Sequence, residues 1–587
     1  MRALRPLRRF STARVADDAA SGWSISAAGA AAAKPNPTHH VANQSQPLSD
    51  YNAYDDAALR EAVHAGGGEW FDESLARLGA QTGSAEWQTR ARVANCSIPE
   101  LRTHDRFGHR VDVVEYHPHY HELMTLALES GVAALPWGEH LERRGVFSAR
   151  GAISHMMYQL EQGHGCPTTM TFAAVPALST TAAVANEWVP KIVDAPSYDG
   201  RDGPNKTGGV TIGMSMTEKQ GGSDVRANTT VGTPVGDGGE GAEYTLRGHK
   251  WFTSAPMSDA FLTLAHTAEG VSCFLVPRWL PDGSRNAGFR LMRLKEKIGD
   301  RSNASSEVEY DNAWARMVGR PGKGVRTIVE MVVHTRLDCV IGSAALMRVC
   351  AQHAAAHAAG RTAFGAPLVE QPLMRAVLAD LALETEAALA SWARLCRSFE
   401  AADGTTDAAL RRLATAVLKY HVCKKAPGVA TEAMECMGGN GYVEDGPLAR
   451  LYRQAPLNAI WEGSGNVICL DVLRTLAVEP ASAAALVDEL AATRGADSRY
   501  DAHVDGLVAE LRAGTAAAEP RRARGLVERL AVALQASTVL STGAPRVAEA
   551  FCAARLAPAG TAYGSAGPDL IPAAAEAELI ERLRSCE

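Results

Sequence analysis

The stretch Ile460-Trp461-Glu462-Gly463-Ser464-Gly465-Asn466 leads directly into an apolar, helical run at 467–476. Its glycines allow the backbone to approach a ligand closely, and Ser464 or Asn466 is placed to cap the helix that follows. Free N–H groups at a helix start attract an electronegative group. A carboxylate pressed against an aromatic ring is expected to have a raised pKa, which suits a general base. The residues alone leave two interpretations: a base at Glu462, or a surface glutamate in a capping loop.

The overall composition is that of an ordinary globular protein. The chain has 587 residues, of which 46% are hydrophobic and 21% charged, with a net charge of −7. This length predicts about three to five domains. We expect no membrane span, because no run of about 18 uncharged apolar residues occurs. The acidic balance argues against strong nonspecific binding to nucleic acid.

Cysteine and histidine spacing predicts no metal. The 11 cysteines are scattered without a CxxC pair, so we expect reduced thiols and no disulfide framework. His117, His119 and His121 alternate as metal ligands on a strand face would. No neighbouring acid or cysteine completes a ligand set, so a solvated loop is the preferred interpretation.

The N-terminus differs in kind from the rest of the chain. Residues 1–16 (MRALRPLRRFSTARVA) contain five arginines and no acid. This composition is typical of a mitochondrial targeting peptide, and a disordered basic tail on a cytoplasmic protein is the alternative. Residues 23–47 have the low complexity of a linker. We therefore assign residues 1–40 to a targeting peptide and linker.

Four regions are predicted to follow: an N-terminal extension with a helical domain (41–207), a β domain (208–318), a helical bundle (319–478) and a helical extension (479–587). The second consists of short Thr/Val/Phe-rich segments between Gly, Pro and Asp turns, which predicts a compact antiparallel sheet. The third contains long apolar runs that, with the 467–476 helix, predict a four-helix bundle with a kink at Pro427. The expected fold class is a mostly α, multidomain α+β protein.

The β region opens with a loop suited to a polar ligand. In MSMTEKQGGSD at 214–224, the hydroxyls of Thr217 and Ser223 flank a Gly-Gly pair. Such a nest of N–H groups suits a pyrophosphate or the polar edge of a flavin, and a plain β-turn is the alternative. It is neither a Walker nor a Rossmann motif. Lys250-Trp251-Phe252-Thr253 adds an aromatic wall and a hydroxyl from a neighbouring strand.

Taken together, these motifs resemble the acyl-CoA dehydrogenase family over about residues 105–476. The resemblance rests on ordered motifs at 216–224, 250–253, 361–365 with Gln371, 438–442 and 461–463. Longer strings such as GMSMTEKQGGSDV and IWEGSGNVICLDVLR, the extra N-terminal segment and the extension past residue 476 are similar to the adaptive-response subgroup of that family.

The resemblance implies FAD, bound between the β domain and the bundle. It assigns the cofactor contacts to Met214, Met216, Thr217, Ser223, Trp251, Phe252, Thr253, Arg361, Phe364, Gln371, Gly438, Gly439, Gly441, Trp461, Gly463 and Ser464. Residues 214–253 would contact the flavin ring and diphosphate, with Trp251 packing on the ring and Thr253 donating toward it. Arg361 and the residues beyond it, up to Gly441, would reach the ADP half of a neighbouring subunit's FAD, which implies a homo-oligomer, usually a tetramer.

The same resemblance gives Glu462 the role of catalytic base. It would take the α-proton of an acyl-CoA while the β-hydrogen leaves as hydride to the flavin, whose electrons pass to an electron-transfer flavoprotein. Neither hydrogen is acidic in water, so removal of both needs a base on one side and an oxidant on the other. The Glu462 N–H would polarise the thioester carbonyl. Arg336 and Ser223 would contact the substrate, with a surface ion pair as the alternative for Arg336.

Two departures from the family pattern bear on the substrate. The family shows Tyr-Glu-Gly-Thr where this chain has Trp461 and Ser464 at the outer positions, and Arg-Asp where it has Arg453-Gln454. A larger ring beside the base favours short or branched acyl groups, or excludes acyl-CoA.

The subgroup resemblance supplies a competing function: a flavoprotein that binds DNA and protects it from alkylation. DNA binding needs a basic face. Residues 471–587 contain 12 Lys plus Arg against 16 Asp plus Glu, for a net charge of −4, and only the run at 521–524 is locally basic. A flavoprotein scaffold without activity is the third possibility, and it would give Glu462 no role.

Overall fold

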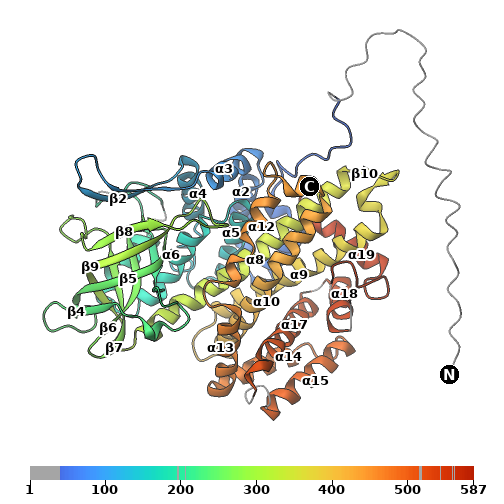
Figure 1. The fold of residues 1–587 in the computed structure, drawn as a ribbon. Helices are drawn as coiled ribbons and strands as arrows, with labels where there is room; N and C mark the ends of the chain where they lie inside the picture. Colours follow the sequence, from blue (N-terminus) through green and yellow to red (C-terminus); the bar gives the residue numbers. More distant parts are fainter. Residues whose placement is uncertain are drawn as a thin grey trace, which may run out of the picture. The chain divides into compact units, whose positions relative to one another are not determined.

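A computed structural model describes residues 40–587, apart from 195–196, 205, 515–518, 543, 558–559 and 561. The predicted targeting segment at 1–16 lies outside these residues, as does most of the predicted linker at 23–47. Residues 1–44 form a unit of their own, and all that follows concerns the second unit, residues 45–587, shown in Figure 1.

The N-terminal region is helical, as predicted. Its elements are η4 (Ala53–Asp55), α1 (Ala57–Gly66), η5 (Glu69–Phe71), α2 (Asp72–Thr82), α3 (Ala85–Cys96), α4 (Pro118–Glu129), α5 (Val146–Leu160), α6 (Gly165–Leu178) and α7 (Ala182–Val193). Asp56 and Ser84 accept hydrogen bonds from the first turns of α1 and α3, as N-cap residues do. Helix α5 is buried on every side, and its Arg150 is paired with Asp338 of α8.

The sequence analysis missed a β-hairpin in this region. Strands β1 (Glu100–His104) and β2 (Arg110–Glu115) pair antiparallel around a turn at Asp105. The preferred interpretation of the three histidines as a solvated loop was wrong, because His117 caps the start of α4 and the other two lie in its first turn. Within the described part of the chain, no group of three or more His, Cys, Asp or Glu side chains is placed to hold a metal ion.

The β region folds into one sheet, drawn in green in Figure 1. Its strands are β3 (Ile212–Ser215), β4 (Val231–Pro234), β5 (Glu243–Ser254), β6 (Ala260–Thr267), β7 (Gly270–Pro277), β8 (Phe289–Leu294) and β9 (Ser305–Val318), with the short helix η6 (Val225–Ala227). The strand order is β3-β6-β4-β5-β9-β7, with β8 on β9 and a further pairing of β6 with β7. Most pairs are antiparallel, but β6 runs parallel to both β3 and β4, so the sheet is mixed rather than purely antiparallel.

The predicted four-helix bundle is present. It consists of α8 (Gly324–Gly360), α9 (Pro372–Phe399), α10 (Thr406–Cys436) and α13 (Gly465–Val478). Shorter elements join them: β10 (Thr362–Ala363), β11 (Ala366–Pro367), η7 (Leu368–Glu370), α11 (Gly439–Tyr442), α12 (Leu448–Gln454) and η8 (Leu457–Ala459). Helix α8 is long and apolar enough to cross a membrane, but 94% of its apolar window is buried inside the protein. It is the central helix of the core, against which α5, α6, α9 and α10 pack.

The C-terminal extension is helical and belongs to the same core. Its elements are α14 (Pro480–Ala491), α15 (Ser498–Ala513), η9 (Pro520–Arg522), α17 (Ala523–Ser541), α18 (Pro545–Leu556) and α19 (Ala573–Leu583), drawn in orange to red in Figure 1. A buried cation links it to the N-terminal helices: Arg348 of α8 pairs with Asp56 at 2.7 Å and donates to the carbonyl of Arg582 at 2.8 Å.

Candidate active site

The loop between η8 and α13 holds Glu462 in an unusual backbone conformation. Glu462 has φ +57° and Gly463 has φ +101°. A non-glycine residue in this left-handed region costs about 1–3 kcal/mol unless its surroundings enforce it. The surroundings therefore have to hold this loop in place.

Two cationic side chains enforce the conformation by binding three consecutive carbonyl oxygens. Lys419 of α10 is 1% exposed, and its Nζ donates to the carbonyls of Trp461 at 2.7 Å and Gly463 at 2.6 Å. Arg336 of α8 donates from Nε to the carbonyl of Glu462 at 3.0 Å. We call the Lys419 and Arg336 contacts the carbonyl clamp. Since these hydrogen bonds have charged donors, each is stronger than an ordinary backbone pair.

The arginine of the carbonyl clamp is itself held by an acid. Arg336 Nη1 lies 3.0 Å from Asp471 of α13, and Arg412 of α10 lies 2.6 Å from the same carboxylate. The ion pair given as the alternative for Arg336 is therefore present. It is largely buried rather than on the surface.

The Glu462 carboxylate has the environment of a base. Its Oε2 accepts a hydrogen bond from the hydroxyl of Thr335 at 2.7 Å. Burial raises the pKa of Glu462, and the Thr335 hydrogen bond and the charges of Lys419 and Arg336 oppose that rise. A raised pKa of Glu462 agrees with the sequence-based expectation. Its cause is burial of the whole carboxyl group rather than the Trp461 ring alone.

The Trp461 indole next to the base is fixed in position. Its Nε1 donates to Asn458 Oδ1 at 2.8 Å, and the Asn458 amide donates to the Ser343 hydroxyl at 3.1 Å. Ser464 occupies the N-cap position of α13, but its hydroxyl makes no capping bond and is exposed. Asn466 lies inside the helix. Neither predicted side-chain cap is therefore formed.

The 214–224 loop is organised by a buried ion pair that the sequence analysis did not single out. Glu218 is fully buried and accepts from Lys250 Nζ at 3.0 Å. It also accepts from the backbone N–H groups of Thr229 and Thr230 and from the Thr230 hydroxyl at 2.6 Å. Although burial opposes it, the Thr230 hydrogen bond and the Lys250 charge lower the pKa of Glu218 to about 2. An ionised Glu218 thus anchors the loop that carries Thr217 and Ser223.

The predicted flavin-contacting residues around this loop differ in accessibility. The Trp251 N–H donates to the Thr217 carbonyl at 2.8 Å, so the strand and the loop lie side by side. Ser223 is exposed, Phe252 is 49% exposed, and Met214, Met216 and Trp251 are half-buried. Lys295 Nζ lies 3.4 Å from the Trp251 ring centroid. Thr253 is fully buried, and its hydroxyl is hydrogen-bonded to that of Ser215.

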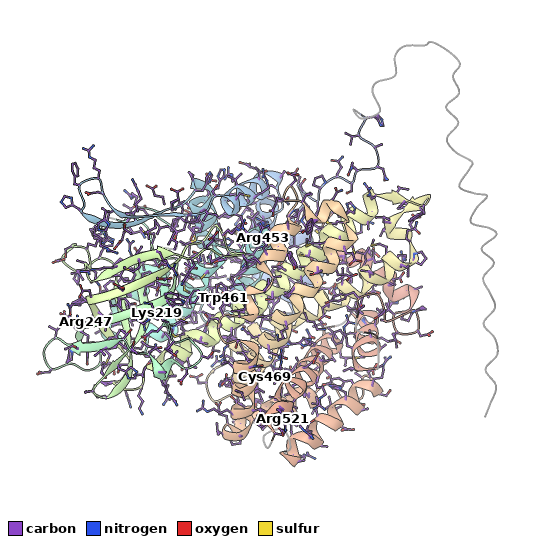
Figure 2. The ribbon with its side chains drawn as sticks, in the orientation of Figure 1. Lys219, Arg247, Arg453, Trp461, Cys469 and Arg521 are labelled. Carbon is purple, nitrogen blue, oxygen red and sulfur yellow. The ribbon has the colours of Figure 1, made fainter. Side chains whose placement is uncertain are left out.

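The remaining predicted cofactor residues come from two other parts of the bundle. Phe364 is 100% exposed, and Gln371 donates to the Ala363 carbonyl at 3.0 Å. Figure 1 shows that the β10 segment beside Arg361 lies at the opposite end of the molecule from the β sheet. Gly438, Gly439 and Gly441 come from the start of α11. Within one chain, the β10 segment therefore lies away from Trp461, which is on the side of the bundle toward the β domain (Figure 2).

The β domain meets the bundle close to the base-bearing loop. The Asp300 N–H, between β8 and β9, donates to Gln454 Oε1 at 2.6 Å. Figure 2 shows Trp461 on the side of the bundle toward the β domain, where Lys219 marks the edge of the sheet. Gln454, noted in the sequence as a departure from the family's Asp, thus joins the two domains.

Three domain families match this order of regions. The N-terminal domain of the adaptive-response protein AidB matches residues 43–200, the acyl-CoA dehydrogenase middle domain residues 213–313, and the acyl-CoA dehydrogenase C-terminal domain residues 322–477. AidB of Escherichia coli (strain K12) is 43% identical over 518 residues, which cover 88% of this chain and 94% of AidB. The chain belongs to the acyl-CoA dehydrogenase family. The resemblance stated from the motifs, including that to the adaptive-response subgroup, is confirmed.

Solved structures confirm the fold. The crystal structure of Caenorhabditis elegans ACDH-11 in complex with C11-CoA aligns with a TM-score of 0.76, 24% identity and 94% coverage of both chains. An acyl-CoA dehydrogenase from Bacillus anthracis complexed with FAD aligns with a TM-score of 0.61 and 18% identity, covering 79% of this chain and 86% of that one.

FAD is the cofactor of this family, and the residues present fit it. Trp251 lies beside the 214–224 loop, which carries the exposed Ser223. At Gly221, with φ +121°, and at Gly438 and Gly439, an added Cβ would meet no atom within 4 Å. Open glycine backbone of this kind leaves room for a phosphate or a ring to approach closely.

Proposed function

We propose that the protein is an FAD-dependent dehydrogenase of a short or branched acyl-CoA. One observation carries the proposal: a glutamate of raised pKa is held by the carbonyl clamp where the bundle meets the β domain. Family membership supports the reaction class, and the C11-CoA bound to ACDH-11 supports a CoA thioester as substrate.

In the proposed reaction Glu462 takes the α-proton of the thioester. Burial raises its pKa, which makes it a better proton acceptor than an exposed carboxylate, and the Thr335 hydrogen bond orients the receiving oxygen. When bound, FAD supplies the oxidant that takes the β-hydrogen as hydride. The carbonyls of residues 461–463 point to the clamp, and the Glu462 N–H would help to polarise the thioester carbonyl.

Trp461 limits the acyl group in this proposal. Its indole is tethered by Asn458, which in turn is tethered by Ser343, so the ring is not free to move away from a long chain. A fixed wall beside the base favours short or branched acyl groups.

The site is expected to be completed by a second copy of the chain. The predicted cofactor residues Arg361, Phe364, Gln371 and Gly438 fit a contact with the neighbouring subunit's FAD, and the fully exposed Phe364 ring supports this. We therefore propose a homotetramer. Electron transfer to an electron-transfer flavoprotein and a mitochondrial location remain part of the proposal and rest on the family pattern and on residues 1–16.

Anaerobic titration of the FAD-loaded protein with a panel of acyl-CoAs tests the function. Short or branched acyl-CoAs are expected to bleach the flavin, and Glu462→Gln is expected to keep FAD and lose the bleaching. Glu435→Gln, which changes an exposed glutamate of α10, is the matched control. Undiminished bleaching in Glu462→Gln would remove the base from the proposal. No bleaching by any acyl-CoA, together with salt-sensitive binding to duplex DNA, would favour the DNA-protecting alternative.

A further inference from the structure

A cavity of about 470 Å³ lies where the N-terminal helices meet the β domain, and it contains no residue assigned to the proposed reaction. Its walls come from β2, the start of α4, Pro167 at the start of α6, the segment 198–202 with Lys206, and the turn 255–258 that follows β5. This volume lies within the range of pockets that hold small molecules, about 300–1,000 Å³. We infer that the cavity is a binding site for a small, uncharged aromatic molecule bearing a hydrogen-bonding group.

The aromatic preference follows from four rings in the wall. Tyr116 and Tyr120 stack with centroids 4.3 Å apart, and the His121 ring meets both edge-on at 5.9 and 5.8 Å. Tyr198 stacks on His121 at 5.8 Å, and its hydroxyl is hydrogen-bonded to His121 Nδ1 at 3.0 Å. Such a ring cluster offers stacked and edge-on positions to a further ring, which are worth more than apolar area alone.

The uncharged preference follows from the cations in the wall, because both are already paired with acids. Arg201 binds Asp199 through two hydrogen bonds of 2.9 Å from Nε, and Lys206 Nζ lies 2.9 Å from Asp259. No cation of the wall is therefore left for a carboxylate or for the phosphates of CoA.

The acids of the wall are likewise paired, and the rings are neutral. Asp202 binds Arg278 at 2.7 Å, and Glu115 binds Arg102. Burial lowers the pKa of His121 and raises that of Tyr120, so both rings are neutral near pH 7. No charged group of the wall is left unpaired to attract a cationic ligand either.

A buried hydroxyl supplies the hydrogen-bonding part of the site. Ser258 is 3% exposed, and its Oγ has no hydrogen-bond partner among the described residues. The Tyr120 side chain, also 3% exposed, lines the same cavity. Buried hydroxyls are normally paired, so an unpaired one beside a cavity indicates a missing partner.

Phenol is a suitable probe, titrated calorimetrically into the full-length, FAD-loaded protein. Saturable 1:1 binding is expected. Benzoate and benzylammonium, the charged probes, are expected to bind at least about tenfold more weakly, because the wall offers no partner for a buried charge. Cyclohexanol, which lacks the ring electrons, is also expected to bind more weakly than phenol.

Variants locate the binding site. Ser258→Ala is expected to weaken phenol binding about fivefold, the effect of one hydrogen bond. Tyr452→Phe, on the exposed face of α12, is the matched control and is expected to leave phenol affinity unchanged.

Four outcomes overturn the inference: no saturable phenol binding, benzoate or benzylammonium binding as tightly as phenol, wild-type phenol affinity in Ser258→Ala, or displacement of phenol by butyryl-CoA. The last would place the cavity within the acyl-CoA site. None of these results depends on whether acyl-CoA reduces the flavin.

Discussion

Replacing Lys419 by methionine tests whether the carbonyl clamp makes Glu462 a usable base. The substitution keeps the length and apolar packing of the side chain but removes the ammonium that binds the carbonyls of Trp461 and Gly463. It leaves Arg336 as the remaining member of the clamp. Two effects are expected, one on stability and one on the pKa of Glu462.

The stability effect follows from the two lost hydrogen bonds. A hydrogen bond to a charged group contributes roughly 1.5–3 kcal/mol net, and removal of a buried ammonium recovers part of that loss. We expect Lys419→Met to lower the free energy of unfolding by about 2–3 kcal/mol, measured by urea denaturation. With its two flanking carbonyls released, Glu462 is also expected to leave the left-handed conformation part of the time.

The electrostatic effect sets the pH dependence. Burial raises the pKa of Glu462, and the Lys419 charge opposes that rise, so its removal raises the pKa further. The base acts when it is ionised, and the rate of flavin reduction is therefore expected to increase with pH through the pKa. In Lys419→Met the whole increase is expected at higher pH than in the wild type. Single-turnover anaerobic flavin reduction across pH measures this shift directly.

Two further variants and one additional measurement make the test decisive. Lys424→Met changes an exposed lysine of the same helix and is expected to leave both stability and pH profile unchanged. Lys419→Arg keeps the charge and is expected to keep most of the pH profile. If no acyl-CoA is turned over, the pKa of Glu462 is still measurable by carboxyl infrared difference spectroscopy. An unshifted pKa in Lys419→Met would show that the clamp does not tune the base.

Further predictions concern the base, its partners and the cofactor loop. The pKa of Glu462 is higher in the folded protein than in the unfolded chain, so the protein loses stability as the pH rises from the unfolded-state pKa through the folded-state pKa. Glu462→Gln removes this loss and is therefore expected to raise the Tm at pH 7, with a difference that vanishes near pH 4. Thr335→Val removes the hydrogen bond to the carboxylate. We expect it to lower the free energy of unfolding by about 1 kcal/mol, measured with denaturant, and to shift the pH–rate profile to higher pH. Lys250→Met leaves a buried carboxylate unpaired, so we expect a loss of about 3–5 kcal/mol and release of FAD on gel filtration. Asn458→Ala frees the Trp461 indole, and longer acyl-CoAs are expected to bleach the flavin in that variant.

The fold was largely predictable because its signals are local. Apolar positions recur with helical spacing over each long bundle helix, and Thr/Val/Phe-rich segments between turns mark the strands. The β1–β2 hairpin was missed because both strands are short and the region around them reads as helix and loop. The parallel pairing of β6 with β3 and β4 was missed because strand direction depends on which strands become neighbours, not on their composition.

The candidate site was predictable only where a motif carries it. Glu462 stands out in sequence because glycines follow it, but the residue that holds its loop is 42 to 44 positions away and binds carbonyl oxygens. A contact to a backbone carbonyl places no constraint on the partner's residue type, so the sequence contains no matching pair to find. The available signal was Lys419 itself, a lysine within the apolar run of α10.

The same reasoning explains why Glu218 and Lys250 were missed although both lie in quoted motifs. In sequence, each is a charge in a turn or strand, where charges are usually solvated. In the structure they neutralise each other in the core, with Glu218 also bound by two backbone N–H groups. The carbonyl clamp and this pair share one feature: in each, a buried lysine fixes a loop that is expected to contact the cofactor or the substrate. The base-bearing loop and the cofactor loop are therefore held by separate cations, and Lys419→Met and Lys250→Met should damage catalysis and FAD binding independently.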